Sequence, residues 1–359
     1  MSKLRLGVIG AGSWAISSHL PNLAERRDEV EFVAVARHGA ERLAKVKDDF
    51  GFAVASEDFR AVLDAGIDIC LVASPTGLHH RHAKAAMEAG AHVLVEKPFT
   101  IDPLDAWDLV DVAAARDRHL VVAFGWNYKS MVREMKRAMD ERGVGEVEQM
   151  TIAMASATRE LLSNTGAYPD AAPESVPEQG TWTDPRLSGG GYGQAQLSHA
   201  LGLALWLTGL RGEAAFALMS APLGAPVELH DAAAVRYRGG AIGTLGGGST
   251  HLGLGDNKHQ LEVRAIGSEG QVLVDVEREA GWLWRTDGEL RLDLADGAGA
   301  YACDGPPDTL VDLALGREVE NASPGELAAR TVELLDAIYR SAESGALEQV
   351  RGTGEREPS

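Results

Sequence analysis

The sequence predicts a two-domain α/β protein, with a doubly wound parallel sheet first and a large, mostly antiparallel sheet after it. In the first third, apolar runs rich in Val, Ile and Leu alternate with Ala-rich helical segments, which is typical of strands buried on both faces. In the second half, strands of alternating polarity follow one another through tight turns. The length of 359 residues suits two domains. We expect these domains over 1–124 and 125–350, with a disordered tail over 351–359.

The first domain is expected to contain five parallel strands. Right-handed crossovers place the carboxyl ends of such strands at one edge of the sheet, where ligands bind. Residues that follow these strands are therefore the first candidates for a functional site. In chain order the strands read LRLGVIG, EFVAVA, DICLVAS, HVLVE and LVVAFG.

The second domain is expected to pack helices against one face of its sheet. One helix follows the glycines at 189–191, and a second, amphipathic helix begins after Ser323 as N-cap and stops at Gly345. We interpret the glycine string at 246–248 as a strand end or a close backbone approach, because no helix follows it. The strands read EVEQMTIAMASAT, GEAAFALMSAP, DAAAVRYRGGAIGTLGGGST, HQLEVRAIGSEGQVLVDVE and GWLWRTDGELRLD.

Composition limits the classes of partner and the compartment. The net charge of −19 disfavours nucleic acids and anionic membranes. The sequence contains no run of 18 apolar residues, so we predict no transmembrane helix. The first residues lead directly into a strand and lack the features of a signal peptide. Only Cys70 and Cys303 are present, which argues against a disulfide framework and fits a reducing cytosol. We expect a cytoplasmic protein and predict no metal site.

The turn after the first strand carries a G-x-G-x-x-A pattern formed by Gly10, Gly12 and Ala15. Gly10 permits the tight turn, Gly12 lets the backbone approach a pyrophosphate, and Ala15 lets helix and strand pack closely. The amino terminus of the following helix stabilises phosphate charge. We therefore predict a dinucleotide site here, with Ser13 and Trp14 also contacting the cofactor.

The tip of the second strand selects the cofactor. NAD sites place a carboxylate there to bind the ribose hydroxyls, whereas this strand ends in Ala36, Arg37, His38 and Gly39. Arg37 can pair with a 2′-phosphate and stack on adenine. The alternative is a solvated surface arginine. We predict NADP(H) in preference to NAD(H), with Arg37 and His38 in the cofactor site.

The fourth strand ends in Glu96, Lys97 and Pro98. A lysine beside an apolar nicotinamide has its pKa lowered by desolvation and can exchange a hydroxyl proton, whereas the charge of Glu96 favours the ammonium form. Pro98 fixes the backbone and aims the amine. The alternative is an ordinary surface lysine in a turn.

Three stretches resemble the Gfo/Idh/MocA family, the group of glucose–fructose oxidoreductase, inositol dehydrogenase and related sugar dehydrogenases. The resemblance covers nearly the whole chain and implies an N-terminal Rossmann domain and a C-terminal α/β domain with a mostly antiparallel sheet. It also implies oxidation or reduction of one carbon of a sugar or cyclitol with a nicotinamide cofactor, and homodimers or homotetramers built on the exposed face of that sheet. The stretches are GVIGAGSWA, ASPTGLHHRHAKAAMEAGAHVLVEKPF and GGGYGQAQLSHALGLALWLTG.

The resemblance also assigns roles to individual residues. Glu96, Lys97 and Pro98 match the catalytic box, in which the Lys97–Pro98 bond is expected to be cis, and His199 matches the histidine on the helix after the glycine run. Further matches line the nicotinamide side (Ser74, Pro75, His79) or the entry to the second domain (Asn127, Tyr128).

One position departs from the family pattern. The family usually has an aspartate one helical turn before this histidine, and Ala195 stands there in this chain. Alanine neither moves a proton nor orients an imidazole, so the division of labour in proton transfer differs. We expect Gln194 and Gln196 to hold substrate hydroxyls, since neither is an acid or a base near neutrality. The alternative for His199 is a core histidine bonded to a backbone carbonyl.

A long segment over 159–191 is rich in Pro, Gly, Ser and Asp. Long connections without regular structure are often lids or binding loops. Tyr168 and Trp182 lie in it, and we expect them either to stack on a sugar face or to pack in a dimer.

Together these features predict an NADP-preferring sugar or cyclitol dehydrogenase. Lys97 is its main proton-transfer residue, and His199 assists it or binds substrate. The first alternative is an enzyme that holds NAD tightly and uses transient oxidation to eliminate a glycosidic substituent. The second alternative is a cofactor-binding sensor without catalytic activity.

Overall fold

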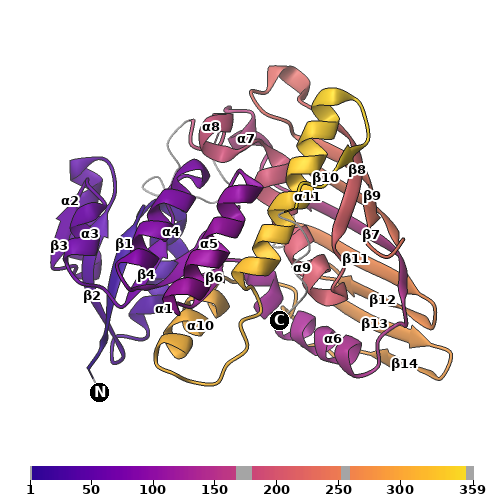
Figure 1. Ribbon diagram of the computed structural model, residues 1–359, viewed down its shortest axis with the longest axis horizontal. Helices are drawn as coiled ribbons and strands as arrows, with labels where there is room; N and C mark the ends of the chain where they lie inside the picture. Colours follow the sequence, from indigo (N-terminus) through magenta and orange to yellow (C-terminus); the bar gives the residue numbers. More distant parts are fainter. Residues whose placement is uncertain (1, 167–179, 252–258, 353–359) are drawn as a thin grey trace. The chain divides into compact units, whose positions relative to one another are not determined.

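The computed structural model describes residues 2–166, 180–251 and 259–352. The chain forms two compact units (Figure 1). Unit 1 comprises Met1–Ala123, Ala171–Thr181 and Cys303–Ala329, and unit 2 comprises Phe124–Asp170, Trp182–Ala302 and Arg330–Ser359. The domain limits expected from the sequence stay predictions. Among the described residues, no helix is both long and apolar enough to cross a membrane.

Unit 1 contains a six-stranded parallel sheet in the order β3-β2-β1-β4-β5-β6. This confirms the predicted doubly wound sheet and its five strands. The sequence analysis missed β3, which has only three residues and no buried apolar run. The strands are β1 (Leu4–Ile9), β2 (Val30–Ala36), β3 (Val54–Ser56), β4 (Ile69–Val72), β5 (His92–Val95) and β6 (Leu120–Val122).

The helices of unit 1 connect successive strands of this sheet. Asp102 begins α5 by accepting a hydrogen bond from the amide of Leu104, and Pro103 takes the first helical position. The helix α10 comes from the later part of the chain, after the second sheet. The helical segments are η1 (Ala15–His19), α1 (Leu20–Ala24), α2 (Ala40–Phe50), α3 (Arg60–Asp64), η2 (Thr76–Leu78), α4 (His79–Glu88), α5 (Pro103–Arg116) and α10 (Gly305–Ala314).

Unit 2 contains a nine-stranded sheet in the order β14-β13-β12-β11-β7-β10-β9-β8-β15. Among the described strands of this sheet only the pair β7 and β10 is parallel, so the predicted mostly antiparallel sheet is confirmed. The strands are β7 (Val147–Ser156), β8 (Gly212–Ser220), β9 (His230–Tyr237), β10 (Ile242–Ser249), β11 (His259–Gly267), β12 (Gly270–Asp275), β13 (Ala280–Arg285), β14 (Gly288–Arg291) and β15 (Glu348–Gln349).

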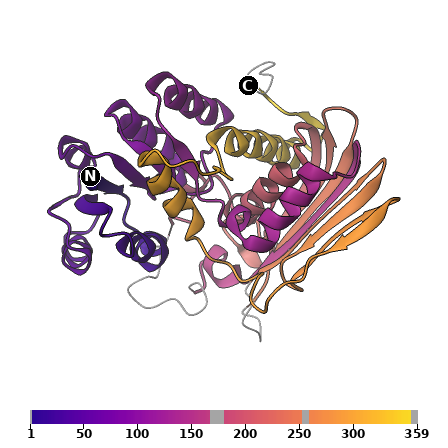
Figure 2. The ribbon, with the colours of Figure 1, turned by 90° about the horizontal axis from the view of Figure 1, so that it is seen from below.

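Helices of unit 2 lie against one face of this sheet (Figure 2). The helix α9 is buried almost all round, as its unbroken apolar sequence predicts. A Cβ atom added at Gly247 of β10 would lie 2.6 Å from side-chain atoms of Leu197 and Tyr192, so this glycine permits the close approach that we expected. The helical segments are η3 (Gly125–Tyr128), α6 (Ser130–Glu141), α7 (Arg159–Leu162), α8 (Pro185–Ser188), η5 (Gly193–Leu197), α9 (Ser198–Thr208), η6 (Pro222–Gly224) and α11 (Gly325–Ser344).

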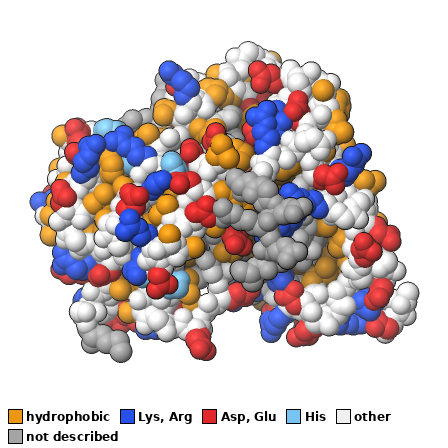
Figure 3. Space-filling model, in the orientation of Figure 1, with side chains coloured by type: hydrophobic (Ala, Val, Ile, Leu, Met, Phe, Trp, Pro, Cys, Tyr) orange, Lys and Arg blue, Asp and Glu red, His pale blue; other side chains and the backbone are white. Residues whose placement is uncertain are grey.

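The surface mixes charges of both signs. On the face drawn in Figure 3, acidic and basic side chains are interspersed. The formal charge of −19 is therefore a property of the whole sequence and does not appear as one acidic patch on this face.

Candidate active site

The turn after β1 has the backbone of a phosphate-binding loop. Gly10 has a φ angle of +90°, and a Cβ atom there would lie 2.3 Å from the backbone nitrogen of Ser74. A Cβ atom at Gly12 would meet only the Gly10 oxygen within 4 Å, at 3.9 Å, so this position leaves room for a ligand. Helical structure starts at Ser13, and Ala15 is buried. The two glycines therefore serve different purposes: Gly10 lets β1 and β4 end close together, and Gly12 leaves space.

This turn lies where the strand order of unit 1 reverses. The neighbours of β1 are β2 on one side and β4 on the other, and open α/β sheets bind ligands outside the carboxyl ends of strands at such a switch point. Gly10 follows β1 and Ser74 follows β4, so their close approach marks this point.

Arg37 lies beside the glycine turn. Its Nη1 donates to the carbonyl oxygen of Ala11 at 2.9 Å, and its Nε donates to the carbonyl oxygen of His38 at 3.2 Å. His38 is exposed, and Trp14 is 39% exposed. The carboxylate of Glu57 accepts a hydrogen bond from the amide of Gly39, so an acidic group also stands near the tip of β2.

Two histidines of α4 connect the segments after β4 and β5. The Nε2 of His79 lies 2.6 Å from the carbonyl oxygen of Ser74, and its Nδ1 lies 2.9 Å from that of Pro98. Burial lowers the pKa of His79, and a neutral imidazole can donate from only one nitrogen. The Nδ1 of His82 contacts the hydroxyl of Ser74 at 2.9 Å, and burial lowers the pKa of His82 to about 4. Pro75 precedes η2 in the same segment.

Lys97 follows β5, the neighbour of β4, at the carboxyl edge of the sheet. The Lys97–Pro98 peptide bond is cis, as the family resemblance implied. Burial lowers the pKa of Lys97, while the nearby groups of Glu96 and Cys303 act in the opposite direction. Burial thus shifts this amine toward the neutral form, which can accept a proton.

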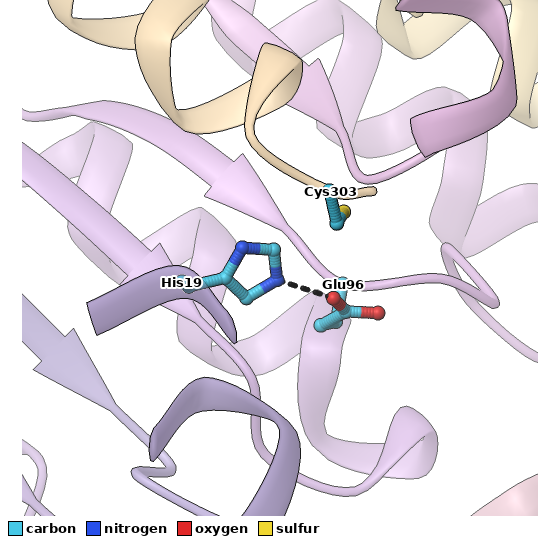
Figure 4. Close-up of side chains that lie close together, drawn as sticks. All are labelled: His19, Glu96 and Cys303. Carbon is cyan, nitrogen blue, oxygen red and sulfur yellow. Dashed lines mark hydrogen bonds and ion pairs between the residues drawn. The ribbon is translucent and has the colours of Figure 1, made fainter. Parts of the chain in front are cut away.

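Glu96 is held by two hydrogen bonds within unit 1. Its Oε1 lies 2.5 Å from the Nε2 of His19, a fully buried residue of η1, and its Oε2 accepts from the amide of Lys97 at 2.9 Å. Figure 4 shows His19, Glu96 and Cys303 converging from three segments of the chain. Burial raises the pKa of Glu96, but the hydrogen bond with His19 and the charge of Lys97 lower it, and the net shift is downward. The carboxylate therefore stays ionised beside Lys97.

His19, Glu96 and Cys303 offer one ligand atom each within 4.8 Å of one another, a set that zinc proteins also use. Two ligands of a tetrahedral zinc ion, each bonded at about 2.0–2.1 Å, lie roughly 3.3 Å apart. The separation of 2.5 Å between His19 and Glu96 is instead that of a hydrogen bond. Nδ1 of His19 is buried and has no partner among the described residues, whereas metal-bound histidines almost always bond through their second nitrogen. The geometry favours a hydrogen-bonded pair with a neighbouring thiol.

In unit 2, the segment from Gln194 to His199 forms a π-helical turn that continues into α9. His199 is 5% exposed, and Ala195 is also buried. The Oε1 of Gln196 accepts from the hydroxyl of Ser156 at 3.3 Å. The Oε1 of Gln194 is buried without a hydrogen-bond partner among the described residues. Two polar side chains thus flank the alanine.

His199 belongs to a group of packed rings in unit 2. Tyr301 packs edge-on against His199 with centroids 5.5 Å apart, and it also contacts Trp126 at 4.8 Å. His259, the first residue of β11, lies 5.8 Å from Tyr301 and 5.9 Å from Trp126. We call these four residues the ring cluster.

Other predicted residues occupy separate positions. Tyr128 ends η3 and is half-buried, while the Asn127 amide, buried beside it, donates to the carbonyl oxygen of Gly202 at 3.5 Å. Trp182 lies in a turn and is half-buried. Tyr168 and most of the predicted lid segment lie outside the described residues. Lys97 belongs to unit 1 and His199 to unit 2.

Sequence reasoning missed several residues of these sites. His19 lies on the buried side of the first helix, and one signal for it was a histidine four residues after Ala15. Cys303, Trp126, His259, Tyr301 and Ser156 gave no local signal, because each reaches its site only through the fold.

Fold and switch-point geometry define unit 1 as a dinucleotide-binding domain of the Rossmann type. Comparison with known families agrees: a family model described as oxidoreductase family, NAD-binding Rossmann fold, matches residues 4–124. A second model, described as GFO/IDH/MocA C-terminal domain, matches residues 132–273. The chain belongs to the Gfo/Idh/MocA oxidoreductase family, as its motifs indicated.

Individual relatives show which proteins the chain resembles. It is 34% identical over 143 residues to inositol 2-dehydrogenase 3 of Saccharopolyspora erythraea, covering 40% of this chain and 42% of that protein. It is 30% identical over 191 residues to D-glucoside 3-dehydrogenase of Escherichia coli, covering 53% and 50%. The chain thus spans about half the length of these curated relatives or less. Among solved structures, levoglucosan dehydrogenase in complex with NADH and levoglucosan has a TM-score of 0.78 at 20% identity, covering 98% of this chain and 100% of that one, which shows the shared fold.

Proposed function

We propose that the protein is an NAD(P)-dependent dehydrogenase that oxidises a hydroxyl-bearing carbon of a sugar or cyclitol, or reduces the corresponding carbonyl. The names of two relatives refer to an inositol and a D-glucoside, and a structural neighbour was solved with levoglucosan. The family to which the chain belongs is described as NAD-binding oxidoreductases.

The observation that carries this proposal is the environment of Lys97. The amine stands at the carboxyl edge of a parallel sheet, one strand from the switch point, with its pKa lowered by burial. Its neighbour Glu96 is fixed by His19 and by the Lys97 amide. A structural surface lysine needs neither a lowered pKa nor a buried, oriented carboxylate beside it.

The proposed chemistry divides between cofactor and protein. The nicotinamide supplies a hydride acceptor at its C4 carbon when it is bound. As a secondary alcohol loses hydride, its hydroxyl proton passes to the neutral amine of Lys97, so a ketone and an ammonium group result. The carboxylate of Glu96 stabilises that ammonium. In reduction the same ammonium returns the proton to the forming alkoxide.

For cofactor choice we propose NADP(H) in preference to NAD(H). Arg37 follows β2, at the strand tip where an arginine can accommodate the 2′-phosphate of the adenosine ribose. Its guanidinium donates to the carbonyl oxygen of Ala11 in the glycine turn. No carboxylate stands at positions 36–39. His199 of unit 2 is proposed to assist proton transfer or to bind a substrate hydroxyl.

The test is turnover followed at 340 nm with a panel of sugars and cyclitols, comparing the wild type with Lys97→Ala. We expect the variant to lose at least about a hundredfold in kcat, because general acid–base groups contribute about 10²–10⁴. Its cofactor affinity, measured by fluorescence titration, should change by less than about threefold. Equal turnover of the two proteins would remove Lys97 from the mechanism.

Two outcomes would replace the proposal. Substrate consumption without a net absorbance change would indicate an enzyme that reoxidises its own cofactor, as in eliminating glycosidases. Tight cofactor binding with no turnover across the panel would indicate a sensor.

A further inference from the structure

Two residues of unit 2 satisfy the backbone amides that begin the helical stretch leading into α9. The first four amides of a helix have no acceptor within it. Here these are the amides of residues 191–194, because the amide of Ala195 is the first that donates to a carbonyl oxygen of the same stretch, that of Gly191. The acceptors for all four amides come from Glu228 and Tyr339.

Glu228 accepts three of the four amides. Its Oε1 accepts from the amide of Gly191 at 2.8 Å and from that of Gly193 at 3.1 Å. Its backbone carbonyl oxygen accepts from the amide of Tyr192 at 3.0 Å. The residue therefore contacts three successive amides through its side chain and its backbone.

Tyr339 of α11 accepts the fourth amide. Its hydroxyl oxygen accepts from the amide of Gln194 at 3.0 Å, and the same hydroxyl donates to the Oε1 of Glu228 at 2.5 Å. Burial raises the pKa of Tyr339, so the phenol keeps the proton that it donates. Glu228 and Tyr339 are thus bonded to each other as well as to the four amides, and we call these two residues the amide clamp.

The amide clamp explains the glycine run at 189–191. A Cβ atom at Gly190 would lie 2.3 Å from the hydroxyl oxygen of Tyr339. A Cβ atom at Gly191 would lie 2.1 Å from the carbonyl oxygen of Glu228. A side chain at either position would push the clamp away from the amides, so both positions require glycine.

The clamped amides open the π-helical turn η5. Such a turn contains one residue more than an α-helical turn and is frequent at functional sites. At its other end, α9 is buried almost all round, which fixes the helix that carries His199 of the ring cluster. Without the clamp, relaxation of the π-turn to an α-turn would rotate the side chains before it by about 100° relative to α9.

We propose that the amide clamp is a positioning device for substrate binding: it fixes the η5 turn, and through it the direction of Gln194 and Gln196 relative to His199. The clamp acts through the backbone and does not need to touch the substrate. The inference rests on the proposed function, in which His199 assists proton transfer or binds a substrate hydroxyl.

The first experiment compares wild type with Tyr339→Phe, which keeps the ring and removes only the hydroxyl. We expect kcat/KM for a polyol substrate to fall at least tenfold, with a larger change in substrate KM than in kcat and a cofactor KM within twofold of wild type. Tyr237→Phe is the matched control, since Tyr237 is a fully buried tyrosine of β9 in the same unit. It should keep kcat/KM within twofold.

A loss in Tyr339→Phe no larger than that in Tyr237→Phe would overturn the proposal. An equal rise of the cofactor KM and the substrate KM would also overturn it, because a general effect on folding does not single out the substrate.

A second comparison uses the conservative replacement of Glu228. The Oε1 atom takes part in the bonds to Gly191, Gly193 and Tyr339, and the amide oxygen of glutamine can take its place. Glu228→Gln should therefore keep kcat/KM within threefold of wild type, whereas Glu228→Leu should lose at least tenfold. Equal losses in the two variants would overturn the clamp.

Hydrogen exchange separates this proposal from the proposed function, because it does not require turnover. The amides of residues 191–194 should exchange at least tenfold faster in Tyr339→Phe than in wild type and at the wild-type rate in Tyr237→Phe. Unchanged exchange in Tyr339→Phe would overturn the clamp even in an active enzyme. Faster exchange in a protein that turns over no polyol would support the clamp and contradict only the proposed function.

Discussion

At residue 97, burial and charge act on one amine in opposite directions. Desolvation disfavours the ammonium form, whereas Glu96 favours it, and burial prevails because the pKa of Lys97 is lowered overall. His19 adds to this balance indirectly, since its hydrogen bond keeps Glu96 ionised despite the burial of the carboxyl group. His19 thus affects the pKa of the proposed catalytic lysine only through Glu96, whose charge opposes the larger effect of burial.

A pH profile tests this arrangement. Glu96→Gln removes the charge that raises the pKa of Lys97, so this pKa should fall further. If neutral Lys97 accepts the proton in oxidation, the acidic limb of kcat/KM against pH should move to lower pH. Glu88→Gln, an exposed charge deletion at the end of α4, is the control and should leave the limb in place. A limb that moves toward alkaline pH in Glu96→Gln would contradict the assignment.

Arg37 gives a second prediction at this scale. Arg37→Asp places a carboxylate after β2, which repels a 2′-phosphate and can accept from ribose hydroxyls. We expect the ratio of kcat/KM for NADP to that for NAD to fall by about tenfold or more, or ~1.4 kcal/mol. Arg118→Ala is the control, since Arg118 precedes β6 at the opposite, amino-terminal edge of the sheet. An unchanged ratio would remove Arg37 from cofactor selection.

At this scale the sequence predicted the residues that follow strands. Gly10, Arg37, Ser74 and Lys97 could be predicted as site residues because parallel strands deliver their following residues to one edge. His19 and Cys303 were missed because their role is a contact: 284 positions, the difference between 303 and 19, separate them in the chain. Such a contact leaves no periodic pattern.

Among the elements, β9 carries an unusual buried acid. Asp231 is 5% exposed, and neither of its carboxylate oxygens has a hydrogen-bond partner among the described residues. Burial and the charge of Glu228 raise the pKa of Asp231 to about 8. Glu228 itself accepts from the amides of Gly191 and Gly193 and from the hydroxyl of Tyr339 on α11. The start of the η5 turn is therefore tied to α11 beside a carboxyl group that stays protonated near neutrality.

The stability of unit 2 should consequently depend on pH. Asp231 keeps its proton in the folded state up to about pH 8 but loses it near pH 4 when unfolded, so its contribution to the unfolding free energy falls as pH rises between these values. Asp231→Asn removes this dependence. The unfolding free energy of the variant minus that of wild type should increase by on the order of a few kcal/mol from pH 5 to pH 8.5, as measured by urea unfolding.

Asp275→Asn is the matched control for that measurement. Asp275 is equally buried, but its carboxylate accepts from Arg278. Loss of this pair should lower the unfolding free energy at neutral pH instead of raising it. A difference between Asp231→Asn and wild type that is constant from pH 5 to pH 8.5 would show that Asp231 is ionised in the folded protein.

The type of an element, helix or strand, could be predicted where the sequence has a long run or regular repeat of apolar residues. It could not be predicted where no such pattern exists. The five predicted strands of unit 1 and the α9 helix have continuous apolar runs, whereas β3 has three residues without a buried apolar run and β15 has only two residues. The π-helical turns at Ala15–His19 and Gly193–Leu197 depend on one inserted residue, which composition does not reveal. Both turns belong to the candidate sites, where such local departures are common.

Across the molecule, rows of uncharged residues run over four strands on the exposed face of the unit 2 sheet. One row across four strands reads Leu218, Ala232, Gly246 and Ala153, and a neighbouring row begins with Phe216 and Ala234. Leu218 is 66% exposed and Ile242 is 59% exposed. Adjacent large and small apolar residues on a sheet suit contact with a second sheet, which supports the predicted homodimer or homotetramer.

Self-association through this face can be measured by light scattering coupled to size-exclusion chromatography. Wild type should have a mass of at least two chains, and Leu218→Glu should shift it toward one chain. Leu223→Glu is the control, because Leu223 is 87% exposed but lies in η6, outside the sheet. A wild type that elutes as a single chain at micromolar concentration would contradict this prediction.

The return of residues 303–329 to unit 1 has a consequence for how this protein can be divided. Within that returning segment, Asp308 and Asp312 pair with Arg26, and Ser323 accepts from the amide of Val122 at the edge strand β6. The nucleotide-binding unit is therefore not one continuous stretch: besides the first 123 residues it includes residues 303–329, which follow the large sheet of unit 2 in the chain. A fragment cut after residue 124 would lack the helix that neutralises Arg26, the strand-edge cover and the thiol beside Glu96. Transplanting this cofactor module into another enzyme requires joining position 123 to position 303 rather than truncating the chain.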